Sequence, residues 1–268
     1  MRRNSRTASL AATTIGLACA LLLSAAPAGT NRAEAETTVE TAATSLPLAG
    51  KVVLIDPGHQ LGNKVHPTQI NRLVNAGGFY KPCNTTGTAT VSGYPESAFA
   101  MSVANNLKRR LTALGARVYM TRTVESLSLW GPCVDVRGRW GGAVHADATI
   151  SIHADGAASS LHGFFVIYPA LRRGWTDDIY GASVLLARDV HTGLRLSGLP
   201  NANYYGGGGF DSRGDLGTLN WSSVPVVMVE MGNMKNATDA TMMKTATRRD
   251  QTYSAGLAKG LTLFLTRP

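Results

Sequence analysis

The segment 51–56, which holds four consecutive apolar residues and is ended by Pro57-Gly58, sets the class of fold that this chain can adopt. Such a run is typical of a strand that is buried on both faces, as in a parallel sheet. Residues 96–114 predict a helix, because apolar side chains recur at three- and four-residue steps from Phe99 to Leu114. Further strands are expected at 116–122, 148–153, 164–168 and 224–230, and further helices at 182–194 and 252–265. We therefore predict one α/β domain with a mostly parallel, twisted sheet flanked by helices.

The first 36 residues have the composition of an export signal. Arginines at the start precede a small and apolar stretch at 10–26, and small residues suited to cleavage follow it. We expect residues 1–36 to be a signal peptide that directs the chain to the periplasm, the cell wall or the outside. The Thr- and Ala-rich residues 37–49 are expected to be a linker to a folded domain at 50–268. No later run of about 18 apolar residues occurs, so we expect no stable membrane insertion.

The chain is basic, with 26 Lys and Arg against 17 Asp and Glu and a net charge of +9. A basic surface favours an anionic partner, such as nucleic acid, an acidic lipid surface or an anionic cell-wall polymer. The charge alone does not choose among these partners.

The cysteine content agrees with export. Cys19 leaves with the expected signal peptide, so the mature chain keeps Cys83 and Cys133. An even pair in an oxidising compartment is most simply a disulfide, whereas two free buried thiols are the alternative. Neither cysteine belongs to a Cys-x-x-Cys pair, which argues against a zinc site built on them.

Side chains that bind metals fall at the ends of the predicted elements. His59 follows the first strand, Glu96 opens the first helix, and His153 and Glu230 end two later strands. Each has an ordinary structural alternative, such as a hydrogen-bonded histidine or a carboxylate that favours a helix N-terminus. The carboxyl ends of parallel strands meet at one edge of a sheet, however, so we expect all four together. Two imidazoles and one carboxylate are a donor set for catalytic zinc, and a second carboxylate could take the proton of an attacking water.

Five short motifs follow one another in order over most of residues 50–268. They are Ile55–His59; Glu96 with Leu111–Gly115 and Thr121-Arg122; Arg137 before Ala146-Asp147; Ser151–Asp155; and Val224-Pro225 before Glu230–Gly232 and Asn236. In these motifs the chain resembles the amidase 3 family of zinc-dependent N-acetylmuramoyl-L-alanine amidases, which are bacterial cell-wall hydrolases.

This resemblance implies that His59, Glu96 and His153 bind one zinc ion and that Glu230 is the catalytic carboxylate. Residues 50–268 would then be a zinc amidase catalytic domain. The implied reaction is hydrolysis of the amide between N-acetylmuramic acid and L-alanine, in cell-wall turnover or daughter-cell separation. Its partners would be peptidoglycan or muropeptides and not nucleic acid, and we expect a monomer.

The chain departs from the family pattern beside the first histidine, where Gln60-Leu61 replaces a Gly-Gly pair common in the family. The segment between His59 and Glu96 is long and holds Cys83. We therefore predict that the disulfide pins this insertion beside the active-site edge of the sheet. Substrate contacts are expected near Arg213 and Asp215, which could instead form a structural turn, and at Asn236.

Two other functions fit the same residues. One is a different zinc peptidase that acts on wall peptides, because a site of two histidines and one glutamate serves several amide cleavages. The other is a non-catalytic exported protein that binds an anionic wall polymer through its basic surface. Analysis of the reaction products distinguishes a zinc peptidase from an amidase. Replacement of Glu230 distinguishes a non-catalytic binding protein from an enzyme, because only the enzyme would lose its activity.

Overall fold

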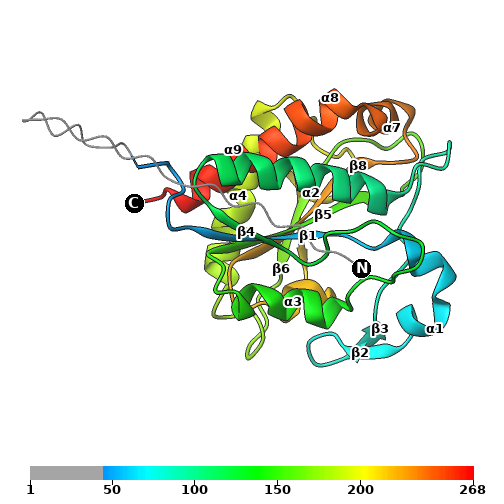
Figure 1. Cartoon of the computed structure of the whole chain (residues 1–268), viewed down its shortest axis with the longest axis horizontal. Coiled ribbons are helices and arrows are strands. Elements are labelled where there is room, and N and C mark those ends of the chain that lie inside the picture. The colour runs from blue at the N-terminus through cyan, green and yellow to red at the C-terminus, as the bar shows by residue number, and fades with distance from the viewer. Residues whose placement is uncertain (1–44) are drawn as a thin grey trace, which may run out of the picture. The chain divides into compact units, whose positions relative to one another are not determined.

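The apolar run at 51–56 forms β1 (Val52–Pro57) of a six-stranded sheet in the computed structural model (Figure 1). The structure describes residues 45–268, so the expected signal peptide and most of the expected linker lie outside the described residues. The linker prediction is wrong for its last residues, because Leu48 is fully buried and its N–H donates to Leu114 O. The folded domain therefore begins a few residues earlier than residue 50.

The sheet has the strand order β4-β1-β5-β8-β6-β7. Its other strands are β4 (Arg117–Met120), β5 (Ala148–Asp155), β8 (Val226–Asn233), β6 (Phe165–Pro169) and β7 (Phe210–Arg213). Neighbouring strands are parallel throughout, except that β6 runs antiparallel to β8. The mostly parallel α/β sheet is thus confirmed.

Helices cover both faces of this sheet (Figure 1). The larger core lies against α2 (Glu96–Ala113), α4 (Tyr180–Leu196) and α9 (Ala255–Leu265), which bury Phe99, Leu107 and Leu186 against the strands. The opposite face packs on α3 (Val134–Ala143) and α6 (Gly217–Asn220). Because both faces are covered, most side chains of the central strands are buried, including the polar Asp56, Thr149 and Ser151.

The long segment between β1 and α2 contains short regular elements. These are a 3-10 turn η1 (Leu61–Val65), α1 (Pro67–Ile70) and the antiparallel hairpin of β2 (Leu73–Asn75) and β3 (Tyr80–Pro82). The remaining elements are α5 (Gly206–Gly209), α7 (Ala237–Lys244), α8 (Ala246–Arg248) and a π-helical turn η2 (Arg249–Ser254). Within the described part of the chain, the helices are all too short or too polar to span a membrane.

The predicted disulfide is confirmed. Cys83, just after β3, is bonded to Cys133, which is the residue before α3. Val134 N also donates to Cys83 O, and the Asn84 amide donates to Pro132 O. These contacts fasten the middle of the insertion to the start of α3.

Candidate metal centre and active site

Four side chains meet at the edge of the sheet where β1, β5 and β8 end. His59 follows β1, Glu96 is the first residue of α2, and His153 and Glu230 face each other in register on β5 and β8. The two strands continue two and three residues beyond His153 and Glu230, so the structure places both residues slightly inside the edge. All four residues line one cavity of about 340 Å³.

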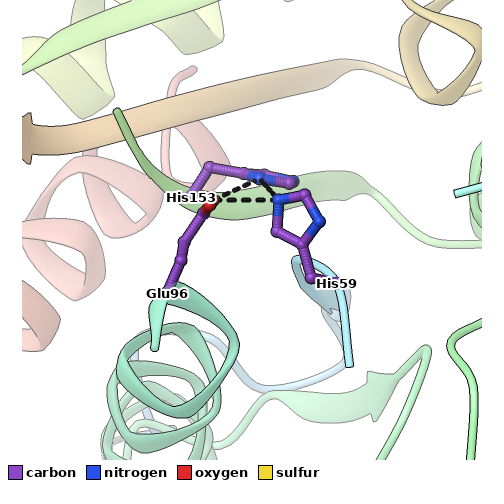
Figure 2. Close-up of side chains that lie close together, drawn as sticks. All are labelled: His59, Glu96 and His153. Carbon is purple, nitrogen blue, oxygen red and sulfur yellow. Dashed lines mark hydrogen bonds and ion pairs between the residues drawn. The ribbon is translucent and has the colours of Figure 1, made fainter. Parts of the chain in front are cut away.

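The potential metal ligands His59, Glu96 and His153 contact one another (Figure 2). Glu96 Oε1 is 3.0 Å from His59 Nε2 and 2.9 Å from His153 Nδ1, and the two nitrogens are 3.1 Å apart. One donor atom from each residue lies within 4.8 Å of the others. Two imidazole nitrogens and a carboxylate oxygen are the donor set of many catalytic zinc sites, so these residues fit a zinc ion.

The loop of residues 85–88 orients two of these ligands through its backbone. His59 Nδ1 lies 3.0 Å from Thr85 O, so a proton on Nδ1 leaves Nε2 free to bind a metal. Thr88 N donates to Glu96 Oε2 at 2.9 Å, while Ala154 N donates to Oε1 at 3.2 Å. Main-chain groups leave no sequence signal, which is why sequence reasoning missed this loop.

Close backbone contact at the site requires glycine. A Cβ atom on Gly58 would overlap the ring of His153. His59 itself has a φ of 56°, a left-handed conformation that is costly for a residue with a side chain. The Arg137 guanidinium helps to hold this turn, because Nη2 donates to His59 O at 2.9 Å and Nη1 to Pro57 O at 2.8 Å.

A buried ion pair supports the turn from below. Asp56 is fully buried, and its carboxylate accepts hydrogen bonds from Arg137 Nη1, Thr121 Oγ1 and Ser151 Oγ. Burial alone would raise the pKa of Asp56, but the Arg137 charge and the two hydroxyls hold that pKa below its usual value. The carboxylate is therefore ionised and fixed in place.

The charges of the ligands depend on one another. Burial would lower the pKa of His59, but the adjacent Glu96 raises it, whereas burial dominates at His153 and lowers its pKa. Burial would raise the pKa of Glu96, and the two imidazoles reverse that effect and lower it. Glu96 is thus a carboxylate, as a metal ligand must be.

Glu230 differs from the other three residues. Burial, together with Glu96 and Asp155, raises the pKa of its carboxyl group well above the usual range. Its buried Oε2 has no hydrogen-bond partner among the described residues. A carboxyl group with one free oxygen, in the same cavity as the potential ligands, is suited to accepting and returning a proton.

The other predicted site residues lie at the border of the cavity or away from it. Arg213 and Asp215 form an ion pair of 2.7 Å, and Asp215 also contacts Lys81, which does line the cavity. Asn236 does not line it: its side chain caps α7 by accepting from Thr238 N and Asp239 N. A substrate contact at Asn236 stays a prediction. Lys81 and Arg137, which line the cavity, were not predicted as part of it.

Comparisons with known proteins agree with this geometry. Residues 53–262 match a family model described as N-acetylmuramoyl-L-alanine amidase. The chain is 41% identical to the N-acetylmuramoyl-L-alanine amidase Rv3717 of Mycobacterium tuberculosis over 224 residues, which is 83% of this chain and 90% of the relative. Crystal structures of the amidase Ami1 from Mycobacterium smegmatis and Mycobacterium abscessus each superpose with a TM-score of 0.75 at 38% identity. They cover 81% of this chain and 98% and 99% of their own chains, respectively.

Proposed function

Because the chain belongs to the N-acetylmuramoyl-L-alanine amidase family, we propose that it hydrolyses its amide substrate with one zinc ion held by His59, Glu96 and His153. The substrate is the bond between N-acetylmuramic acid and L-alanine, in peptidoglycan or its fragments. The observation that carries the proposal is the convergence of the three ligand atoms within 4.8 Å. When bound, zinc polarises an amide carbonyl and lowers the pKa of the attacking water to about 7.

The protein supplies the proton transfer through Glu230. The water oxygen forms a bond to the carbonyl carbon, and the free Oε2 of Glu230 takes the proton that the water loses. The bond between the carbonyl carbon and the alanine nitrogen then breaks, and Glu230 returns the proton to that nitrogen. The raised pKa of Glu230 favours uptake of the water proton, because a weaker acid has a more strongly basic carboxylate.

The remaining residues hold these groups in position. Thr85 O fixes the ring of His59, two backbone N–H groups fix Glu96, and Arg137 fixes the turn that carries His59. Such support matters because a small displacement of a reacting group costs much of the rate. We expect these positioning groups to affect both metal affinity and turnover.

The reaction is tested on a defined muramyl peptide with the mature, zinc-loaded protein. The proposal expects a product with a free lactyl carboxyl group and an intact peptide with a free L-alanine amino group. Cleavage between two amino acids would instead indicate a zinc peptidase. No cleavage at all, with binding to purified cell wall retained, would indicate a non-catalytic binding protein.

We also propose that the protein is exported and acts as a monomer on the wall. The composition of residues 1–36 supports export. The Cys83–Cys133 disulfide supports it independently, because such bonds persist in oxidising compartments. Size measurement of the secreted protein and sequencing of its N-terminus test both points.

A further inference from the structure

A second hollow, of about 350 Å³, lies beside the cavity of the metal centre and shares Gly87 and Thr88 with it. The backbone of the loop between the two is tightly packed on the ligands. A Cβ atom on Gly87 would lie 2.8 Å from Glu96 Oε2 and 2.9 Å from the ring of His59. One width of backbone therefore separates this hollow from the potential metal ligands.

A third hollow, of about 410 Å³, continues from the second one and shares Lys235 with it. Lys64 lines the second hollow and Lys244 lines the third. Hydroxyl side chains line the same two hollows, at Thr86, Thr88, Thr90, Ser92, Ser97 and Thr241. We call the two hollows with Lys64, Lys235 and Lys244 the lysine track.

The positive charge of the lysine track is not compensated. No Asp or Glu lines either hollow, and the three lysines form no ion pair within residues 45–268. Lys235 Nζ donates to the neutral Ala89 O at 2.8 Å, and Lys244 Nζ to Ser92 Oγ at 3.3 Å. By contrast, the lysine in the metal-centre cavity, Lys81, is 3.4 Å from the Asp215 carboxylate.

The substrate of the proposed function has one charged side and one neutral side. The carboxyl group of muramic acid is consumed in the amide, so the sugar side of that bond carries no charge. The peptide is joined through its amino end, so it keeps at least its terminal carboxylate. Uncompensated lysines attract carboxylates and gain nothing from a neutral sugar.

We propose that the lysine track binds the carboxylates of the peptide side of the substrate. The neutral sugar side then occupies the metal-centre cavity, where Pro82, Val134, Leu216 and Met228 provide apolar surface. This assignment rests on the proposed function, because that function defines which bond lies at the metal centre. The assignment fixes the orientation of the substrate, with the sugar in the metal-centre cavity and the peptide on the lysine track.

The test compares N-acetylmuramoyl-L-alanyl-D-glutamate, whose carboxylates are free, with its carboxamide. Binding is measured by calorimetry on the zinc-loaded Glu230→Gln protein, which separates affinity from turnover, and kcat/KM is measured on the otherwise unchanged protein. The free acid should bind more tightly than the carboxamide. Replacement of Lys64 or Lys235 by Met should weaken binding of the acid about two- to fivefold each, the range for single exposed ion pairs, and leave the carboxamide unchanged.

Two controls make the result specific. Lys259→Met removes an exposed lysine on α9 and should change neither affinity. Lys235→Arg keeps the charge and should retain the preference for the acid. Equal affinity for acid and carboxamide, or an equal loss for both in the Lys→Met variants, would overturn the proposal. The proposal would also be overturned if the Lys→Met variants bound purified wall more weakly but bound the muramyl peptide as before, since the lysine track would then bind an anionic wall polymer.

The two proposals fail in different ways. If the unchanged protein does not cleave the muramyl–alanine amide, the proposed function is wrong even when the acid binds better than the carboxamide. If it cleaves both compounds equally well and binds them equally, the function stands and the lysine track has no role in binding the peptide.

Discussion

Replacement of Arg137 by Met tests whether the buried ion pair beneath the metal centre supports the site. The Arg137 side chain is 3% exposed and its partner Asp56 is fully buried. Arg137→Met keeps much of the side-chain volume but removes the guanidinium, so the Asp56 carboxylate keeps its two hydroxyl donors and loses its countercharge.

Arg137→Met should lower the free energy of unfolding, because it leaves the charge of the Asp56 carboxylate buried without a partner. Removal of one partner of a buried pair destabilises proteins by about 3–5 kcal/mol. A matched control lies two residues along the same helix, where Arg139 is 46% exposed and pairs with Asp135 at 2.7 Å. Arg139→Met should cost about 1 kcal/mol or less, the range for an exposed pair.

Urea unfolding followed by circular dichroism gives both free energies of unfolding. Zinc affinity is measured on the same proteins, because Arg137 also donates to His59 O. We expect Arg137→Met to weaken zinc binding about 10- to 100-fold, as loss of a group that orients a ligand does. A double variant with Asp56→Asn should recover part of the stability, since no buried charge remains. A cost for Arg137→Met no larger than that for Arg139→Met would refute the reasoning.

Three further predictions follow from single features. Glu230→Gln should lower kcat about a hundredfold to ten-thousandfold, because it removes the group that transfers the proton. The zinc content, measured by elemental analysis, should stay unchanged. Loss of zinc from this variant would contradict the role given to Glu230. Replacement of both Cys83 and Cys133 by Ser removes a disulfide that joins residues 50 positions apart. The free energy of unfolding, measured in urea, should fall by up to about 4 kcal/mol. An unchanged free energy of unfolding would show that the other contacts of the insertion are sufficient to hold it. The folded protein holds the pKa of Asp56 below the ordinary value of 3.8. The ion pair of Asp56 therefore contributes its full stability above pH 3.8, and this contribution is lost as the pH falls through the lower pKa of the folded state. Acid titration of stability should therefore be less steep below about pH 4 in Asp56→Asn than in the unchanged protein, and equal slopes would contradict the lowered pKa.

The sequence was sufficient for the central strands and for α2. The strand expected at 51–56, with its four consecutive apolar residues, is observed at Val52–Pro57, and the helix expected at 96–114 is observed at Glu96–Ala113. Pro95 precedes that helix and Gly115 follows it with a φ of 97°, as expected of residues that begin and end helices. The potential ligands were predicted because each lies at or near the end of an element that the sequence indicates, although β5 and β8 continue beyond His153 and Glu230.

The missed features depend on contacts between distant segments. Helix α3 has the sequence VDVRGRWGGA, whose glycines and charges give no apolar face, and it is held by the disulfide and by the contacts of Arg137. The hairpin of β2 and β3 has strands of three residues, too short for a pattern. The antiparallel direction of β6 depends on its pairing with β8, which no local signal specifies.

The measurement that tests the account most directly is zinc content together with cleavage of a muramyl peptide, in the mature protein and in His153→Ala. We predict one zinc ion per chain, cleavage of the muramyl–alanine amide that stops with a chelator and returns with zinc, and loss of both zinc and cleavage in the variant. Full cleavage by protein stripped of metal, or one tightly bound zinc in His153→Ala, would contradict it.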